Sequence, residues 1–246
     1  AADGYRRLKA IARDGPNYAA VRRSLAGSLN ARGWSRAAEH EAQIAASLEP
    51  ASFQSRIMLA EYALARRRLE EAKVEAARLI AAYPESRRVQ RFGREVDAAR
   101  GWGLEAELGP KWNEGGGANA SGQEWSSIVR LDTPQIAPRL RLFLLEESSV
   151  AHPPEGRVSR HRAAGGIGLR GSDVAATIYV ANSWGTIDRG HAGFTLNWEI
   201  NDRLSVGAGG ETFSRQSPLR ALHYGITAKS LSGWASWRSS ESTAIS

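Results

Sequence analysis

Three prolines at a spacing of 34 residues constrain the fold of this chain more than any other feature. Pro16, Pro50 and Pro84 each follow an Ala-rich stretch with helical periodicity. A period of 34 residues is typical of tetratricopeptide repeats, in which pairs of antiparallel helices stack into a solenoid. We therefore predict helical repeats over residues 1–100. Complete repeats are expected at 19–52 and 53–86, with a partial repeat before them and a capping helix after them.

Small and apolar residues recur at equivalent places in the repeats, which supports this register. The equivalent sets are Gly4, Ala38 and Ala72; Leu8, Ala42 and Ala76; and Ile11, Ala45 and Leu79. At these places the second helix of a repeat packs on the first. Gly33 is expected in the turn between the two helices. The alternative interpretation is an Ala- and Arg-rich helical bundle without repeats.

The segment from residue 86 to residue 100 departs from the repeat pattern. Gly93, Arg94 and Asp97 stand where the pattern expects apolar residues. A terminal helix of a solenoid exposes one polar face, because no further repeat covers it. We therefore expect this segment to be the capping helix.

From residue 102 onward the hydrophobic period changes to two, the period of a β-strand. Phe194, Leu196 and Trp198, for example, alternate with polar residues. Such alternation gives each strand one apolar and one polar face. We expect about eight strands, and residues 243–246 are expected to begin a ninth. The eight are predicted at 102–111, 123–132, 139–147, 159–170, 173–182, 192–200, 203–213 and 224–238.

The alternation fits a half-buried soluble β-sandwich and also a transmembrane β-barrel with lipid outside and water inside. Connection lengths favour the barrel, because short turns alternate with long loops. The short turns are 133–138, 171–172 and 201–202, and the long loops are 115–119, 148–158, 183–190 and 214–223. Tryptophans near strand ends suit the aromatic girdles of a membrane protein. They are Trp102, Trp125, Trp184, Trp198 and Trp237.

The fold class predicted from these patterns is α followed by β in two domains. A tetratricopeptide α-solenoid at 1–100 precedes an antiparallel transmembrane β-barrel at 101–246. A sheet of eight or nine strands with two open edges is an incomplete barrel, since bacterial barrels have even strand numbers and no free edges. We therefore expect the chain to be a fragment of a longer protein.

The net charge of +7 lies entirely in the helical part of the chain. Residues 1–100 carry 19 Lys and Arg against 12 Asp and Glu, whereas residues 101–246 carry 14 of each. A basic excess can indicate nucleic acid, an anionic membrane surface or an acidic protein partner. The arginines are spread over the helices rather than clustered, which favours a solvated surface, and we expect no nucleic-acid partner.

Enzyme chemistry finds little support in the sequence. The chain has no cysteine, no His-Glu-x-x-His, no Gly-x-Ser-x-Gly and no phosphate-binding loop ending in Gly-Lys-Ser/Thr. Its five histidines are scattered without ligand spacing. Adjacent Glu146 and Glu147 would point to opposite faces of a strand, so they cannot flank one glycosidic bond. We expect no catalytic residue, no metal site and no cofactor.

One local stretch carries a resemblance to a known family. Phe213-Ser-Arg-Gln-Ser-Pro-Leu-Arg-Ala-Leu222 is followed by Gly225-Ile-Thr-Ala228. It resembles the Pro-Leu-Arg-Ala-Leu…Gly-Ile/Val-Thr-Ala segment between two barrel strands in the PgaA/HmsH family. These proteins are outer-membrane porins that export poly-β-1,6-N-acetyl-D-glucosamine. Residues 198–202, an aromatic strand end and an Asn-Asp turn, are also similar to that family, and the similarity covers roughly residues 80–246.

The resemblance implies export of a partly deacetylated, hence cationic, biofilm polysaccharide from the periplasm to the cell surface. In that family a periplasmic tetratricopeptide domain binds the polymer or its deacetylase partner, and the barrel forms an electronegative pore. The implied partners are therefore the cationic polymer, the deacetylase and outer-membrane lipid. Two alternatives remain open: a porin for another polysaccharide, such as cellulose or alginate, and a soluble adaptor that joins the repeats to a β-sandwich.

A pore for a sugar polymer needs weak, repeated contacts rather than a catalytic group. Carboxylates attract glucosamine ammonium groups, and aromatic rings stack on sugar faces. The alternation assigns four candidate carboxylates to the polar face: Glu105, Glu107, Glu199 and Glu211. The alternative for each is an ion pair with an arginine, for which we consider Arg130, Arg160 and Arg162.

Further candidates lie near the predicted loops and on the helices. Trp184 is expected either to stack on sugar or to join an interfacial girdle. Arg220 lies in a loop anchored by Pro218, which is either a pore constriction or a locked turn. On the first helices of the repeats, whose concave face is the usual binding surface, the candidates for partner binding are Arg22, Arg23, Arg56 and Tyr62. Their basic character fits an acidic protein better than a cationic polysaccharide.

Overall fold

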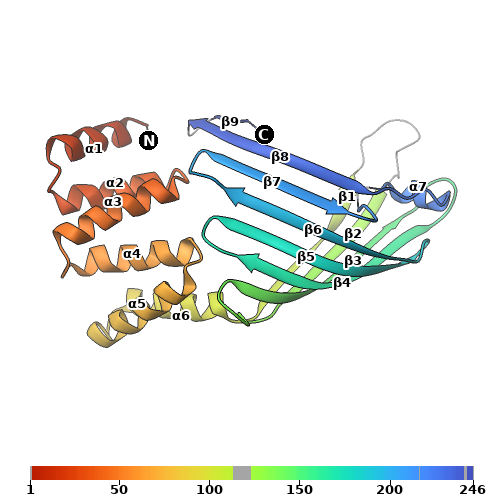
Figure 1. Cartoon of the computed structure of the whole chain (residues 1–246), viewed down its shortest axis with the longest axis horizontal. Coiled ribbons are helices and arrows are strands. Elements are labelled where there is room, and N and C mark those ends of the chain that lie inside the picture. The colour runs from red at the N-terminus through yellow and green to blue at the C-terminus, as the bar shows by residue number, and fades with distance from the viewer. Residues whose placement is uncertain (1, 113–122, 216, 241–242, 246) are drawn as a thin grey trace.

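The computed structural model shows a stack of helices beside one end of a long, curved β-sheet (Figure 1). The structure describes residues 2–112, 123–215, 217–240 and 243–245. The helices are α1 (Ala2–Asp14), α2 (Ala19–Asn30), α3 (Ser35–Leu48), α4 (Phe53–Ala65), α5 (Leu69–Ala82), α6 (Arg87–Arg100) and α7 (Leu219–His223). The strands are β1 (Gly103–Trp112), β2 (Gln123–Asp132), β3 (Leu140–Ala151), β4 (Val158–Arg170), β5 (Val174–Gly185), β6 (Arg189–Glu199), β7 (Leu204–Glu211), β8 (Ser230–Ser240) and β9 (Thr243–Ile245).

Helices α1–α6 form the arm, and the two predicted repeats correspond to the helix pairs α2–α3 and α4–α5. Alanines at the equivalent places, Ala38 and Ala72 among them, are completely buried, so neighbouring helices approach closely. Ile11 is 51% exposed, whereas its equivalents Ala45 and Leu79 are buried. The difference arises because no helix precedes α1 in the described chain to cover that face.

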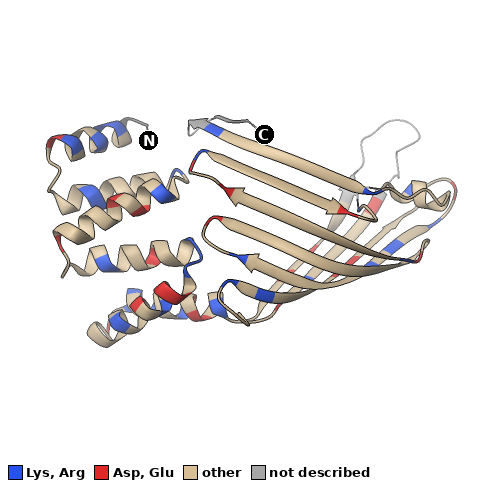
Figure 2. Ribbon diagram, in the orientation of Figure 1, with Lys and Arg blue, Asp and Glu red and all other residues tan. Residues whose placement is uncertain are grey.

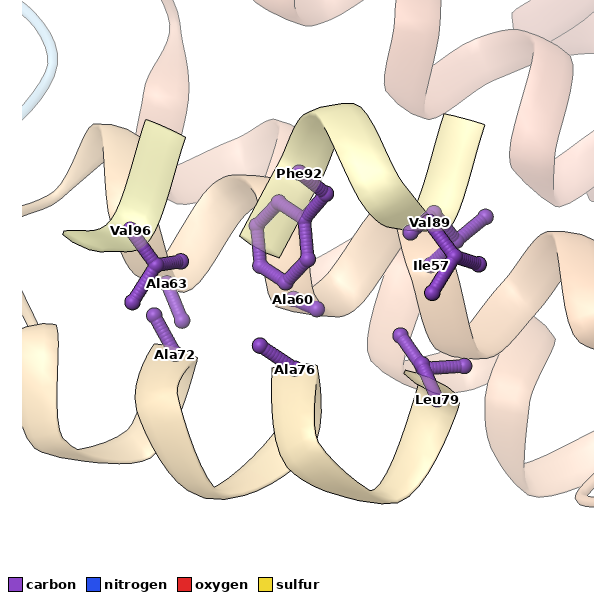
Figure 3. Packing of buried hydrophobic residues seen from close by; sticks show 9 residues of the cluster. All are labelled: Ile57, Ala60, Ala63, Ala72, Ala76, Leu79, Val89, Phe92 and Val96. Carbon is purple, nitrogen blue, oxygen red and sulfur yellow. The ribbon is translucent and has the colours of Figure 1, made fainter. Parts of the chain in front are cut away.

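The last helix of the arm closes the hydrophobic core of the second repeat (Figure 3). Val89, Phe92 and Val96 of α6 are buried against residues of α4 and α5 such as Ile57 and Leu79. In α6 the buried positions Val89, Phe92, Gly93 and Val96 form one stripe, whereas Arg94 and Asp97 are exposed. The arm therefore ends in a helix that has one partnered face.

The turns inside the two repeats share an unusual backbone conformation. Gly33 has a positive φ of 76°, as expected for the residue that follows a helix in the left-handed region. Arg67, 34 residues later, has a φ of 58°, although a side chain is disfavoured there. The repeat period therefore extends to the backbone geometry of the turn, even where the glycine is absent.

The strands form one antiparallel sheet of nine strands in chain order, with β1 and β9 at its edges. The edges are not paired with each other within the described chain, so the sheet is an incomplete barrel. The predicted alternating pattern and the start of a ninth strand are confirmed. Strands β3 and β5 extend beyond their predicted ends, to Ala151 and Gly185. The predicted loop at 115–119 lies outside the described residues.

The eighth strand is the main departure from the predicted boundaries, because it begins at Ser230 rather than at residue 224. Residues 219–223 form the short helix α7 directly after Pro218. The amide of Ser214 then donates to the carbonyl of Ala228, which fixes the base of the connection between β7 and β8. We call residues 212–229 the β7–β8 segment.

The two faces of the sheet differ sharply in chemistry. On one face the side chains are apolar and exposed; Leu104 is 73%, Ile178 70% and Leu231 82% exposed. Figure 2 shows charged residues on the arm and near the strand ends, with few along the middle of β5–β8. Apolar side chains in a continuous exposed band fit contact with lipid. None of the described helices has the length and apolar character needed to cross a membrane.

The predicted tryptophans lie at two levels of the apolar face. Trp125 and Trp184 are at the ends of β2 and β5 that lie away from the arm. Trp198 and Trp237 are near the ends of β6 and β8 on the arm side, and Trp102 directly precedes β1. All five are at least 40% exposed. Two levels of interfacial tryptophan, with an apolar band between them, are typical of an outer-membrane barrel.

Candidate pore lining

The strand register brings the predicted carboxylates to one face of the sheet, which we call the inner face. Glu105 is opposite Arg130, Glu199 is opposite Ser205, and Glu211 is opposite Gly193. Because paired residues of antiparallel strands point to the same side, these pairs line one continuous surface from β1 to β8. The surface carries serines, glycines and threonines together with carboxylates and arginines, as expected for a water-filled lumen.

Three of the four predicted carboxylates are exposed on this face. Glu105, Glu107 and Glu199 have no side-chain hydrogen bond or ion pair among the described residues. Arg130, the cross-strand neighbour of Glu105, instead pairs with Asp132 at 2.9 Å and stacks over the ring of Phe143. A contact between these three glutamates and a cationic polymer stays a prediction.

Glu211 has a different environment, because it belongs to a buried cluster of charges. Arg162, only 1% exposed, lies 3.5 Å from a carboxylate oxygen of Glu147 and 3.4 Å from one of Glu211. Arg215 also contacts both carboxylates, at 2.6 and 3.1 Å. The hydroxyl of Tyr179 donates to Glu211 at 2.5 Å. The alternative considered for Glu211, an ion pair with arginine, is the one the structure shows.

The β7–β8 segment folds back onto the inner face at the end of the sheet away from the arm. Phe213, Leu219 and Leu222 are buried against Ala151 and Val158, which belong to β3 and β4. The contact crosses the sheet, since β5 and β6 lie between β4 and β7. The segment therefore covers part of the inner wall near one mouth of the lumen.

Two arginines of β4 hold the β7–β8 segment through its backbone. Arg160 donates to the carbonyl oxygens of Arg215 and Ser217, at 3.0 and 3.3 Å. Arg162 donates to the carbonyl oxygen of Phe213 at 2.8 Å. The guanidinium groups thus connect the folded-back chain to the wall. Arg160 and Arg162, which we considered as ion-pair partners of the candidate glutamates, do not pair with the exposed Glu105, Glu107 or Glu199.

Arg220 fixes the outer tip of the same segment. Its guanidinium forms an ion pair with Glu155, in the connection between β3 and β4. The hydrogen bond from Arg220 holds the pKa of the Glu155 carboxyl below its usual range. Of the two alternatives predicted for the loop anchored by Pro218, the fixed turn agrees with these contacts, and a pore constriction at Arg220 stays a prediction.

Trp184 lies on the apolar face, near the outer end of β5. Its ring is stacked on that of His161 with centroids 5.9 Å apart, and the Ser148 hydroxyl lies 2.8 Å from Nδ1 of His161. This position fits the interfacial girdle, one of the two roles considered for Trp184. A side chain there points away from the inner face.

Sequence reasoning did not single out Trp234, which lies on the inner face opposite Gly207. The signal was present, because Trp234 has the same parity along the strand as Ser230, Ser232 and Ser236. Its neighbours Leu231 and Trp237 have the opposite parity. Parity in β8 therefore separates Trp234 on the inner face from Trp237, three residues later, on the apolar face.

The residues predicted to bind a partner of the arm connect neighbouring helices. Arg22 pairs with Glu41 at 2.7 Å, Arg23 with Glu49 at 2.6 Å and Arg56 with Glu75 at 2.7 Å. Tyr62 is only 7% exposed and packs in the core formed by α1–α4. A contact between these four residues and a partner stays a prediction. No three His, Asp or Glu side chains in the described parts of the chain are grouped so as to hold a metal ion.

The arm contacts the turns at the near end of the sheet. Asp202, in the β6–β7 turn, accepts hydrogen bonds from the backbone amides of Arg36 and Ala37, both at 2.9 Å. Asp173, in the β4–β5 turn, pairs with Arg36 at 2.8 Å and with Arg66 at 2.7 Å. The helices are therefore fixed to the end of the sheet at which the short turns lie.

Comparison with known proteins agrees with this architecture. The family model of the PgaA membrane beta barrel domain matches residues 111–246, more than half of the chain. Poly-beta-1,6-N-acetyl-D-glucosamine export proteins of Escherichia coli strains K12 and O157:H7 are both 24% identical over 240 residues. That match covers 94% of this chain and 29% of each relative, so the chain spans less than a third of their length.

Among solved structures, a NanC porin aligns with 11% sequence identity and a TM-score of 0.38, over 56% of this chain and 72% of that one. The family match covers β2 to β9 and the last two residues of β1. The chain therefore belongs to the PgaA membrane β-barrel family and is part of an outer-membrane barrel.

Proposed function

We propose that this chain is part of an outer-membrane porin that exports poly-β-1,6-N-acetyl-D-glucosamine from the periplasm to the cell surface. The observation that carries the proposal is the inner face of the sheet, which presents three exposed carboxylates, Glu105, Glu107 and Glu199, that pair with no described residue. The named function of the Escherichia coli relatives supports the choice of polymer.

The arrangement of charge suits a polymer that carries some free ammonium groups. Exposed carboxylates in water attract such groups by about 1 kcal/mol at contact distance, which is weak enough for release. Arg162 and Arg215 are neutralised by Glu147 and Glu211, so they do not present a free positive charge to the lumen. A chain with scattered cationic groups can therefore move from one carboxylate to the next.

The arm belongs on the periplasmic side in this proposal, because it contacts the short turns of the sheet. It would deliver the polymer to the mouth of the pore and meet the deacetylase that modifies the polymer. Glu199 lies next to the β6–β7 turn, to which Asp202 belongs. The entrance would thus place a carboxylate directly beside the arm.

The function is tested by deleting the gene of the full-length protein and measuring the polymer in medium and periplasm separately. A lectin or antibody specific for poly-N-acetylglucosamine provides the measurement. We expect the polymer to disappear from the medium and to accumulate in the periplasm. Unchanged export of this polymer would assign the pore to another polysaccharide, such as cellulose or alginate.

The exposed carboxylates are expected to make the pore selective for cations. In planar bilayers with a salt gradient, a full-length variant with Glu105→Gln, Glu107→Gln and Glu199→Gln should lose a large part of the cation selectivity of the wild type. The matched control is Glu146→Gln, since Glu146 is an exposed carboxylate on the opposite face of β3. Equal reversal potentials for the triple variant and the wild type would contradict a role of these glutamates in the lumen.

A further inference from the structure

Trp234 differs from the other strand tryptophans whose side chains the structure describes, because it alone lies on the inner face. The others, Trp125, Trp184, Trp198 and Trp237, share the apolar face. Tryptophan on a lipid-facing surface is explained by the membrane interface. A tryptophan in the lumen needs another explanation.

The indole of Trp234 lies flat across the backbone of Gly207 on the neighbouring strand. A Cβ atom added to Gly207 would come within 2.3 Å of Cε2 and 2.4 Å of Nε1 of the indole. One face of the ring is therefore covered by the sheet, and the glycine is what allows this close approach. The side chain is nevertheless 47% exposed, which leaves the opposite face of the ring open to the lumen.

Tyr179 makes the same kind of contact with Gly193 but is closed off. A Cβ on Gly193 would lie 2.5 Å from Cζ of Tyr179. Tyr179 is only 5% exposed, and its hydroxyl is bound to Glu211. Its ring is thus buried in the charge cluster next to the β7–β8 segment and is not accessible to a ligand. An aromatic ring that covers a glycine therefore need not have an accessible face. At Trp234 the outer face of the ring is accessible, whereas at Tyr179 it is not.

The surroundings of Trp234 leave room for a ligand above the ring. Ser232 and Ser236 precede and follow it on the same face of β8, and Ser205 and Gly209 flank Gly207 on β7. All four are small. Glu199, exposed and unpaired in the described chain, is opposite Ser205, two strands from β8 and so about 10 Å across the sheet.

We propose that Trp234 is a stacking platform for sugar rings of the exported polymer, with Glu199 as the neighbouring site for an ammonium group. The inference rests on the proposed function, and it adds a binding residue for the pyranose ring itself. A flat aromatic face binds the apolar face of a sugar whether or not the sugar is acetylated, and it also attracts an ammonium group. Successive sugars can therefore use the same surface, as a moving polymer requires.

The competing explanation is that Trp234 only covers the backbone of Gly207 and stabilises the sheet. Trp234→Leu separates the two, since leucine keeps apolar cover over the glycine but offers no flat face. Trp237→Leu, three residues away on the apolar face, is the matched control. Both variants are made in the full-length protein, and their folding is compared by heat-modifiable gel mobility.

The test is the block of ion current through single pores in planar bilayers by short β-1,6-linked glucosamine oligomers, both acetylated and deacetylated. We expect Trp234→Leu to weaken the block by both oligomers about fivefold to tenfold. Glu199→Gln should weaken the block by the deacetylated oligomer only, and Trp237→Leu should leave both unchanged.

The possible outcomes distinguish failure of the Trp234 assignment from failure of the proposed polymer. Block of Trp234→Leu at wild-type concentrations of both oligomers would overturn the stacking role while leaving the export function in place. Absence of any block of the wild-type pore by these oligomers, with block by oligomers of another sugar, would overturn the proposed polymer and the Trp234 assignment together. Loss of heat-modifiable mobility in Trp234→Leu, with block unchanged in a folded Trp234→Met pore, would identify Trp234 as a cover for Gly207 only, since methionine also offers no flat face.

Discussion

Replacing Arg162 with methionine is expected to release the β7–β8 segment from the wall and to widen the pore. The side chain is 1% exposed and contacts Glu147, Glu211 and the carbonyl oxygen of Phe213. Removing one partner of a buried ion pair leaves an uncompensated charge, at a cost of about 3–5 kcal/mol. Arg215 would then be the one remaining arginine of the cluster for the carboxylates of Glu147 and Glu211. Because the β7–β8 segment is the movable part of the cluster, we expect it to leave the wall so that water can hydrate these carboxylates.

We expect the full-length Arg162→Met variant to have a higher single-channel conductance than the wild type. It should also lose its heat-modifiable mobility at a lower temperature. Arg170→Met is the matched control, because Arg170 is on the same face of the same strand but exposed. Arg160→Met provides a milder variant. It removes two hydrogen bonds to the segment but leaves every buried carboxylate with its ion-pair partner. Conductance should rise in both Arg162→Met and Arg160→Met.

Wild-type conductance in a folded Arg162→Met or Arg160→Met pore would show that the segment does not limit the channel. If Arg162→Met fails to fold, Arg160→Met still decides the question, since it breaks only contacts with the segment. An equal increase for Arg170→Met would mean that any lost positive charge in the lumen raises conductance. The position of the segment would then be irrelevant to the effect.

The parts of the fold that follow from local patterns could be predicted from the sequence. The proline period marked the helix pairs, because each repeat returns the chain to the same turn geometry. The alternation marked which residues share a face, because the side-chain period of a strand is two. For Glu105, Glu107 and Glu199 the predicted face agrees with the strand register and no described residue pairs with them, while their role in the pore stays a prediction.

Contacts between segments far apart in the sequence could not be predicted in this way. Parity places Glu211 and Arg162 on one face but does not show that Phe213 brings the chain back across β5 and β6 to meet β4. The apolar residues of 213–222 look like a loop in the sequence and are buried only because Ala151 and Val158 offer an apolar surface. Likewise, helix periodicity puts Tyr62 on α4 but does not reveal that α1–α3 bury it.

Separating the arm from the sheet is the second large effect that we expect, and two aspartates control it. Helix α3 has no side-chain cap of its own, because Trp34 occupies the capping position. Asp202 supplies the missing acceptor from the β6–β7 turn through its bonds to the amides of Arg36 and Ala37. Loss of a capping side chain costs about 1 kcal/mol, and a carboxylate at a helix N-terminus adds to this.

Asp173 contributes a second connection, and its effect depends on pH. Burial by itself raises the pKa of this carboxyl, but hydrogen bonds from Ser172 and Arg66 and the charge of Arg36 outweigh it, so the pKa lies below its usual range. A carboxyl whose pKa is lower in the docked state stabilises docking above its ordinary pKa of about 4. That contribution is present at neutral pH and is lost as the pH falls through the lowered pKa.

Hydrogen exchange in detergent provides the measurement on full-length protein. In Asp173→Ala/Asp202→Ala, the amides of Arg36 and Ala37 should exchange about tenfold faster or more, since both lose their acceptor and α3 loses its cap. Asp188→Ala is the matched control, because Asp188 accepts from the amide of Gly185 at the opposite end of the sheet.

Unchanged exchange at the start of α3 would show that the arm is held by other contacts. In that case the bonds that the aspartate variants leave in place would hold the arm: Arg36 donates to the backbone carbonyls of Glu199 and Ile200, and Arg141 to those of Ala99 and Gly101 where α6 enters β1. Arg36→Met combined with Arg141→Met would then be expected to produce the separation that the aspartate variants did not.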